Sequence, residues 1–261
     1  MFPNERLRRI CDLVNEKRAI RVSELSRLMD VSEVTIRRDL ETLAREKRLQ
    51  RTHGGAVSVH PVGDEITAPE LIRSHRNVEE KRRIARVAYD MINDKDTLFM
   101  DGSSTVNELA KLIARENDKR LYIITPSLAT VSALADCTNA SVIMLGGEVN
   151  YRLGHVEGTL ATESIRNMRA DKCFIGINGI DESFGFSFPR LIEIDLKCGM
   201  MNSSRQSIVL ADHTKFGHVY MARLNARIDC VVTDTRIEGY DYQWLTDSCS
   251  VLFADEKLKK E

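Results

Sequence analysis

Two short helical segments joined by a connection of only two residues constrain the start of this chain most strongly. One segment begins near Ser23, an N-cap residue type, and the other spans 33–45 with Ser32 as its N-cap. Residues 30 and 31 between them leave room only for a tight turn. Two helices joined in this way are the helix-turn-helix layout, so we expect a small helical domain whose first helix follows Asn4.

The second of these helices is predicted to expose a surface suited to DNA. Ile36, Leu40 and Leu43 fall on one side of the helix and must face the core. The outward side carries Val, Thr and two Arg, an unusual choice for a helix that only has to be soluble. Arg can bridge O6 and N7 of guanine, and Val or Thr can contact a thymine methyl group, while a hydroxyl at the helix N-terminus can donate to a phosphate. The candidate DNA contacts on this helix are Ser32, Val34, Thr35, Arg37 and Arg38.

A short β-hairpin is predicted directly after this helix. Polar and apolar residues alternate over 48–52, and two glycines then turn the chain. Such a wing meets the phosphate backbone or the minor groove, so Arg51 and His53 are further candidate contacts. Residues 1–57 carry a net charge of +4, whereas residues 58–261 carry −5. We therefore expect double-stranded DNA as a partner, although the charge alone would equally suit a solvated surface.

The rest of the chain is predicted to be an α/β domain. Residues 58–78 lack a period and include two prolines, so we assign them to a linker between a winged helix-turn-helix domain at 1–57 and a second domain at 79–261. Alternating strands and helices favour a mostly parallel sheet with helices on both faces. The expected strands are 97–100, 121–125, 142–145, 173–177, 207–210 and 230–233, and the expected helices are 79–92, 105–113, 127–135 and about 192–201.

Four of these strands end in residues that suit a ligand site. Parallel strands bring their carboxyl ends to one edge of a sheet, where ligands bind. After the first strand, residues 101–105 open a helix with small hydroxyl residues, which can hold a phosphate or simply cap the helix. The other three ends carry Gly146-Gly147, Asn178-Gly179-Ile180-Asp181 and Asp212-His213-Thr214-Lys215. Their convergence predicts a binding site at this edge.

Several classes of protein are disfavoured by the sequence. The six cysteines never form a C-x-x-C pair, so we expect reduced thiols and neither disulfides nor a zinc site. No apolar run approaches the roughly 18 residues that a membrane helix needs, and the first residues carry charge where a signal peptide would need an apolar core. We expect a soluble, cytoplasmic protein with no membrane partner, no metal and no cofactor.

The first 57 residues resemble the N-terminal signature of the DeoR family of bacterial transcriptional regulators. The residues that carry this resemblance are Arg6, Ile10, Val14, 32–40 and His53-Gly54-Gly55-Ala56. From about Glu79 to Ala254 the chain is similar to the sensor domain of that family, which looks like the fold of ribose-5-phosphate isomerase and glucosamine-6-phosphate deaminase. The matching pieces there are 101–105, 146–147, 176–181, 193–197 and 212–216.

This resemblance implies a regulator, expected to repress a sugar-catabolism operon, whose second domain binds a phosphorylated sugar. Ser103, Ser104 and Thr105 would hold the phosphate. The hydroxyl or carbonyl end of the sugar would be contacted by Asp181, Glu193, Lys197 and Lys215, and the expected site also includes Asp101, Gly102, Gly146, Gly147 and Gly179. We expect a homo-oligomer, a dimer or a tetramer, because two heads on one duplex make contacts that one head cannot.

Two other interpretations compete with this one. In a sugar-phosphate isomerase with an accessory head, Glu193 would be the base and Lys215 the electrophile. Where such isomerases carry Asp-Gly-Ala-Asp-Glu, however, this chain begins with Asn178, and an amide cannot take up a proton as a carboxylate does. A body that serves only for oligomerisation is the other alternative. We therefore expect a protein that binds its ligand and does not transform it.

Overall fold

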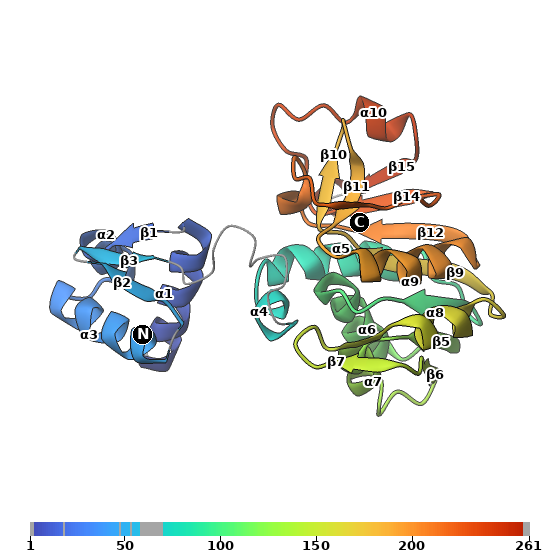
Figure 1. The fold of residues 1–261 in the computed structure, drawn as a ribbon, viewed down its shortest axis with the longest axis horizontal. Helices are drawn as coiled ribbons and strands as arrows, with labels where there is room; N and C mark the ends of the chain where they lie inside the picture. Colours follow the sequence, from blue (N-terminus) through green and yellow to red (C-terminus); the bar gives the residue numbers. More distant parts are fainter. Residues whose placement is uncertain (1–2, 18, 47, 53, 58–69, 258–261) are drawn as a thin grey trace. The chain divides into compact units, whose positions relative to one another are not determined.

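The computed structural model describes residues 3–257 with the exception of 18, 47, 53 and 58–69 (Figure 1). The chain divides into two compact units, Met1–Thr67 and Ala68–Glu261. His53 and most of the predicted linker lie outside the described residues. Helix α4 (Glu70–Ser74), which the sequence assigned to the linker, instead begins the second unit, because it packs on another helix of that unit.

In its described residues, the first unit contains three helices and a small antiparallel sheet in the strand order β1-β3-β2. Its elements are α1 (Pro3–Lys17), β1 (Ala19–Arg21), α2 (Val22–Met29), α3 (Glu33–Arg45), β2 (Gln50–Thr52) and β3 (Gly55–Val57). The side chains of Ile10, Leu25, Ile36 and Leu40 form its core and are almost completely buried. The predicted helix-turn-helix and wing are therefore present.

One expected helix boundary in this unit is wrong. Ser23 was predicted as the N-cap of α2, but the helix begins at Val22 and its N-cap is Arg21, whose side chain makes no capping hydrogen bond. Strand β1, which the sequence did not reveal, ends at Arg21 and leads directly into the helix. Pairing of β1 with β3 therefore decides where the helix starts, in place of a capping hydroxyl.

The second unit is built on a seven-stranded sheet in the order β15-β14-β12-β9-β4-β5-β6, in which every neighbouring pair is parallel. Its strands are β4 (Thr97–Met100), β5 (Leu121–Thr125), β6 (Ala140–Met144), β9 (Ala170–Gly176), β12 (Ser204–Leu210), β14 (Cys230–Thr233) and β15 (Ser250–Phe253). The six predicted strands are all present, with ends shifted by at most a few residues, and β15 is an additional edge strand.

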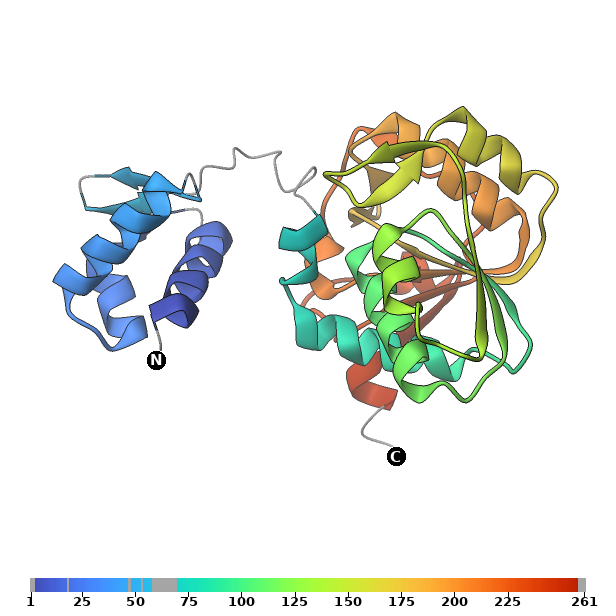
Figure 2. The same cartoon turned by 90° about the horizontal axis from the view of Figure 1, so that it is seen from below.

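Helices cover both faces of this sheet, as Figures 1 and 2 show. One face carries α5 (Val78–Asp90), α6 (Ser104–Glu116) and α7 (Leu128–Ala133), and the other carries α8 (Thr159–Ile165) and α9 (Leu191–Asn202). The shorter α10 (Gln243–Thr246) and α11 (Ala254–Lys257) lie near the C-terminal end of the chain. The predicted α/β architecture is therefore confirmed.

Short antiparallel pieces at the carboxyl edge of the sheet were not predicted. The hairpin of β7 (Glu148–Asn150) and β8 (His155–Glu157) is one of them. A second sheet contains β10 (Gly179–Asp181), β11 (Gly185–Phe188) and β13 (Ala222–Arg223). The helical turn η1 (His213–Lys215) follows β12. These pieces surround the strand ends where the ligand site was expected.

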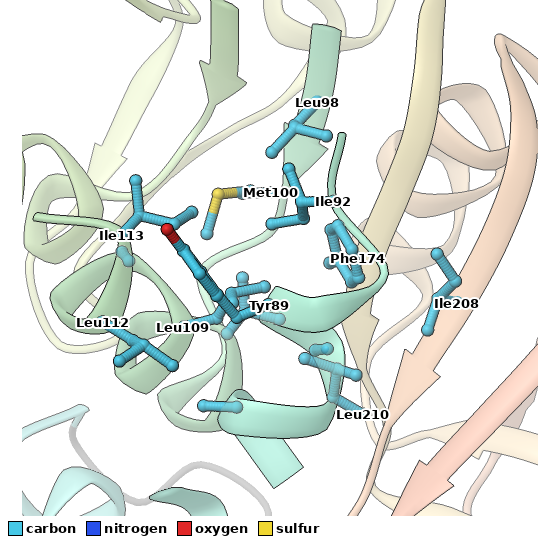
Figure 3. Close-up of a cluster of buried hydrophobic side chains, with 14 of the residues drawn as sticks. Tyr89, Ile92, Leu98, Met100, Leu109, Leu112, Ile113, Phe174, Ile208 and Leu210 are labelled. Atoms are coloured by element: carbon cyan, nitrogen blue, oxygen red, sulfur yellow. The ribbon is translucent and has the colours of Figure 1, made fainter. Parts of the chain in front are cut away.

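The apolar layer between the sheet and helices α5 and α6 fixes the positions of those strand ends. Leu98, Met100, Phe174 and Leu210 lie in this layer and are almost completely buried (Figure 3). Burial of each such side chain stabilises the fold by about 1.5–3 kcal/mol. Strands β4 and β12 therefore have little freedom to move, and the polar residues that follow them are held in defined places.

Two features of the whole chain complete this description. All six cysteines are free, and four of them are buried. In the described part of the chain, none of the helices combines the length and the apolar character that crossing a membrane requires.

Candidate DNA interface and ligand site

Helix α3 presents its predicted contact residues on its outward side. Val34 is 72% exposed, and Arg38, one helical turn further on, is exposed as well. Ser32 caps the helix, because its Oγ accepts a hydrogen bond of 3.3 Å from the Thr35 backbone N–H. The same Oγ lies 3.0 Å from the Thr35 Oγ1. A helix surface that only meets water has no use for an exposed valine. Val34 suits a partner with apolar groups, and the guanidinium of Arg38 suits a partner with hydrogen-bond acceptors.

Two other predicted DNA contacts are held by exposed carboxylates. The Arg37 guanidinium lies 2.7 Å from Glu33 on the same helix, and the Arg51 guanidinium on β2 lies 2.7 Å from Glu41. Exposed ion pairs of this kind contribute about 0–1 kcal/mol. A DNA phosphate can therefore compete for either arginine. His53 lies outside the described residues and stays a prediction.

A buried ion pair fixes the orientation of α3 against α1. Arg6 Nε donates to Asp39 Oδ2 at 2.6 Å, and a second nitrogen of the same guanidinium donates to Oδ1 at 3.2 Å. The hydrogen bond to Asp39 raises the pKa of Arg6, so this arginine stays charged. Both side chains are largely buried. They serve the fold of the head and leave the outward residues of α3 available for DNA.

The end of strand β4 is organised by one buried carboxylate. Asp101 is 2% exposed, and its oxygens accept hydrogen bonds from the backbone N–H groups of Ser103 at 2.9 Å and Gly176 at 3.0 Å. The Lys197 ammonium, on α9, also donates to it. Two residues that the sequence predicted as ligand contacts therefore bind each other here, and together they join β4, β9 and α9.

The predicted phosphate residues form the first turn of α6. Ser103 is the N-cap, and its Oγ accepts a hydrogen bond of 3.3 Å from the Val106 N–H. Ser104 and Thr105 are buried. A side chain at Gly176 would lie 2.4 Å from the Ser103 Cβ, so this glycine allows the close approach of β9 to the helix N-terminus. The backbone N–H groups of Ser103 and Val106 are already bonded within the protein, so those of Ser104 and Thr105 are the candidate donors to an anion at this turn.

The β7–β8 hairpin covers this helix N-terminus and supplies residues that the sequence did not suggest. A Cβ at Gly102 would lie 2.9 Å from the His155 Cβ, so only glycine leaves room for the hairpin. Burial, followed by the charge of Lys197, lowers the pKa of His155 and so favours its neutral imidazole. Gly147 lies against the same hairpin, where a Cβ would be 2.8 Å from the Glu157 carbonyl oxygen, whereas Gly146 faces open space.

A second ion pair closes the site from α9. Glu157 accepts two hydrogen bonds of 2.9 Å from the Arg190 guanidinium, which is a bidentate pair. Glu193, the predicted contact of the sugar end, lies 3.7 Å from the same arginine. The alternating residues of β8 could have signalled His155 and Glu157, but a strand of three residues is too short for a period to stand out.

The remaining predicted contacts belong to a different sheet and to η1. Asp181 on β10 accepts hydrogen bonds from the backbone N–H groups of Ser183 at 2.9 Å and Phe184 at 3.1 Å, so it caps its own turn. The hydrogen bonds from Ser183 lower the pKa of Asp181. Gly179 faces a backbone carbonyl, since a Cβ there would lie 2.3 Å from the His218 oxygen.

Lys215 belongs to a cluster of charges around Asp212. Burial would raise the pKa of Asp212, but the charge of Lys215 and the hydrogen bonds from Thr214 outweigh it and hold this pKa below its usual value. Lys81 on α5 is a buried member that the sequence analysis missed. Burial lowers the pKa of Lys81 to about 8, and its Nζ donates to the backbone oxygens of Arg73 and Arg76, each at 2.6 Å.

The first unit presents the exposed face of α3 beside a wing. The second unit is an α/β domain with a capped helix N-terminus among charged side chains. This combination is that of a DNA-binding transcriptional regulator. Comparison with known proteins agrees with this class. The model of the DeoR-like helix-turn-helix domain matches residues 6–62, and that of the DeoR C-terminal sensor domain matches residues 76–235. The chain belongs to the DeoR family.

Curated relatives resemble the chain over almost their whole length. It is 35% identical to the HTH-type transcriptional regulator GolR of Listeria innocua, over 95% of this chain and 97% of that protein. It is 31% identical to the glycerol-3-phosphate regulon repressor of Escherichia coli, again over 95% and 97%. The prediction of a regulator in preference to an enzyme is confirmed by this membership.

A solved structure of ribose 5-phosphate isomerase A from Methanocaldococcus jannaschii is similar to 54% of this chain, at 15% identity and a TM-score of 0.39, over 55% of its own length. That similarity says nothing about the chemistry of the site.

Proposed function

We propose that this protein represses an operon for carbohydrate breakdown and that a phosphorylated sugar, bound at the N-terminus of α6, controls its affinity for DNA. The observation that carries this proposal is the capped first turn of α6, with Ser103, Ser104 and Thr105. Lys197 donates to Asp101 just before this turn, and Arg190 pairs with Glu157 of the hairpin that covers it. The names of two relatives support a phosphate ligand or a sugar regulon, namely the glycerol-3-phosphate regulon repressor and the lactose phosphotransferase system repressor of Lactococcus lactis.

The charges around this turn explain how a ligand would alter the protein. Lys197 is paired with Asp101, and Arg190 is paired with Glu157. The negative charge of a phosphate near either cation would compete with the carboxylate for it. The ligand therefore favours an arrangement that differs from the one seen here, and such a difference in affinity is what regulation by a ligand requires.

Fluorescence anisotropy on promoter DNA of the neighbouring operon tests the proposal. The DNA complex is titrated with sugar phosphates and with the same sugars without phosphate. We expect one phosphorylated sugar to change DNA binding, by release or by recruitment, and its unphosphorylated form to leave the binding unchanged. Tight binding to DNA that no metabolite alters would favour a body that serves only for oligomerisation.

Two substitutions at Ser103 test whether the ligand binds at this turn. Ser103→Asp keeps a good N-cap residue but puts a negative charge where the phosphate is expected, and Ser103→Asn keeps the cap without the charge. We expect the aspartate variant to lose the response to the sugar phosphate and the asparagine variant to retain it. Equal responses in the two variants would contradict binding at this turn.

The protein is also proposed to act as a homo-oligomer. A single helix-turn-helix head reads one half-site, and operators of such proteins carry two half-sites about one helical turn apart. Analytical ultracentrifugation with and without operator DNA checks this. One copy of the chain on each duplex would contradict it.

A further inference from the structure

The segment of residues 70–77 occupies a special place in the chain. Its N-terminal end continues into residues 58–69 and through them into the DNA-binding unit, and its C-terminal end leads into α5. It is not an isolated connection, because three separate elements at the carboxyl edge of the sheet contact it. These are the β7–β8 hairpin, the first turns of α6 and the loop that carries Asp212.

The contact with the hairpin is made by backbone groups. The Glu70 N–H donates to the Arg152 carbonyl oxygen at 3.0 Å. Gly154 has a φ of +70°, and a Cβ there would lie 3.3 Å from the Glu70 Cβ, so both conformation and space call for glycine. The same hairpin holds His155 against Gly102, at the start of the proposed phosphate turn.

The contact with α6 is made by the Glu70 side chain. One of its oxygens accepts a hydrogen bond of 3.2 Å from the amide nitrogen of Asn107. Asn107 is 2% exposed, and its amide oxygen accepts from Ser127 Oγ at 3.0 Å and Thr130 Oγ1 at 2.8 Å. Because Glu70 bonds the hairpin and α6 at once, those two elements cannot move relative to each other without breaking one of its bonds.

The end of the segment is tied down by buried charge. Lys81 is 4% exposed and donates to the backbone oxygens of Arg73 and Arg76. The side chain of Asn77 donates to Asp212 at 3.3 Å, and Lys215 acts on that same carboxylate. A change at η1 therefore reaches the segment from its other end.

We propose that residues 70–77 are the element that couples the ligand site to the DNA-binding unit, with Glu70 as its positioning residue. The nature of the ligand rests on the proposed function above, but the coupling itself is a property of these contacts. A ligand at the first turn of α6 displaces the hairpin or the helix, the bonds of Glu70 break or shift, and the start of the segment moves with the chain that leads to the head.

The first test needs no ligand. Gly102→Ala forces the hairpin to shift, because the nearest atom, the His155 Cβ, is fixed to the backbone, whereas Gly146→Ala meets nothing within 4 Å and is the matched control. We expect amide hydrogen exchange over residues 70–81 to accelerate about tenfold in the Gly102 variant, comparable to the loss of one buried hydrogen bond, and to stay unchanged in the control. Acceleration confined to the hairpin and α6 would overturn the coupling.

The second test uses DNA release in the full chain. Glu70→Ala is compared with Glu79→Ala, which removes the same charge from an exposed site on α5. The probes are glucose 6-phosphate, fructose 1-phosphate and ribose 5-phosphate, with binding measured by calorimetry and the DNA response by anisotropy. We expect the Glu70 variant to bind DNA and the probe like the wild type but to lose at least about tenfold in the effect of the probe on DNA affinity, a typical allosteric coupling.

The outcomes of the second test separate the two proposals. An unchanged DNA response in the Glu70 variant would overturn the coupling, as would loss of probe binding itself, because Glu70 would then be part of the ligand site. If the wild-type protein binds none of the probes, the proposed function fails, and the exchange experiment decides the coupling by itself.

Discussion

The two units of this protein use charged side chains in opposite ways. In the head, Arg38 points outward on α3, and Arg37 and Arg51 are held only by exposed carboxylates. In the body, the pair of Asp101 with Lys197 is buried at the point where three elements meet. The head can therefore meet DNA with its surface nearly as it stands, whereas in the proposed ligand site a phosphate would have to compete with an internal partner.

The largest effect that this comparison predicts comes from Asp101→Asn. Removal of one partner of a buried pair leaves the Lys197 charge uncompensated, which costs about 3–5 kcal/mol. Trp244, the single tryptophan of the chain, lies in the second unit and reports on its unfolding in urea. We expect Arg37→Ala, which breaks an exposed pair in the head, to leave that transition unchanged. If Asp101→Asn lowers the free energy of unfolding by less than about 1 kcal/mol, the buried pair of the body contributes no more than the exposed pairs of the head.

The pH dependence of the body gives the next effect. Burial lowers the pKa of Lys81 to about 8, from 10.5 for an ordinary lysine. The unfolded chain therefore binds more protons than the folded one between these values, and the free energy of unfolding rises with pH across that window. The neutral amine keeps two N–H groups, which is enough for its two carbonyl partners. The penalty of burying the charge is present below pH 8 and is relieved above it.

The measurement compares the wild type with Lys81→Met, so that other titrating groups cancel. We expect the stability of the wild type relative to this variant to rise by about 3 kcal/mol between about pH 8 and pH 10.5. Urea unfolding followed at Trp244 at several pH values checks this. Two curves that run parallel would show that Lys81 titrates in the folded protein as it does in water.

In the head, the expected effects concern DNA and not stability. Arg38→Ala should relax the base preference at one operator position by about 1–3 kcal/mol, because a base contact is lost. Arg51→Ala should instead weaken binding about equally on all sequences and flatten its salt dependence, as expected for a phosphate contact. Anisotropy titrations on operator variants at several salt concentrations distinguish the two. If both variants lose affinity for DNA with no change in base preference, the prediction that α3 lies in the major groove is wrong.

The sequence predicted those parts of the fold that depend on local patterns. The apolar period placed Ile36 and Leu40 on the buried side and so predicted α3. Short apolar runs predicted strands such as 97–100, because the residues of a buried strand lie next to one another in the sequence. The same reasoning missed β1, β7 and β8. Each of these has three residues, which are too few for a period, and each is stabilised by a partner strand rather than by its own composition.

The candidate site was predictable in its location but not in its internal partners. The strand ends indicated the turn at Ser103 because parallel strands share one carboxyl edge. The pairing of Asp101 with Lys197 joins residues 96 positions apart, and only the fold decides that they meet. For the same reason His155 and Arg190 were missed, since each contacts a residue that is distant in the sequence.

The smallest expected effect is the sharpest check of the exposed pairs in the head. Glu33→Gln releases Arg37, which it holds at 2.7 Å one helical turn away, and also removes a negative charge from the surface predicted to face DNA. The pair contributes only about 0.3–0.5 kcal/mol, so the head should stay folded. We expect affinity for DNA to rise about twofold, with a salt dependence steeper by about one ion.

The matched control is Glu46→Gln, which removes the same charge beyond the other end of α3, where Glu46 pairs with Arg48 at 3.3 Å. If both variants raise the affinity equally, the gain reflects net charge, and Arg37 is not a phosphate contact. If only the Glu33 variant gains, Arg37 exchanges a carboxylate for a phosphate at almost no cost. In the body, replacing Glu157 by a ligand phosphate as the partner of Arg190 would cost more than this exchange in the head. Glu157 is buried and lies on the β7–β8 hairpin, so its release would disturb that hairpin.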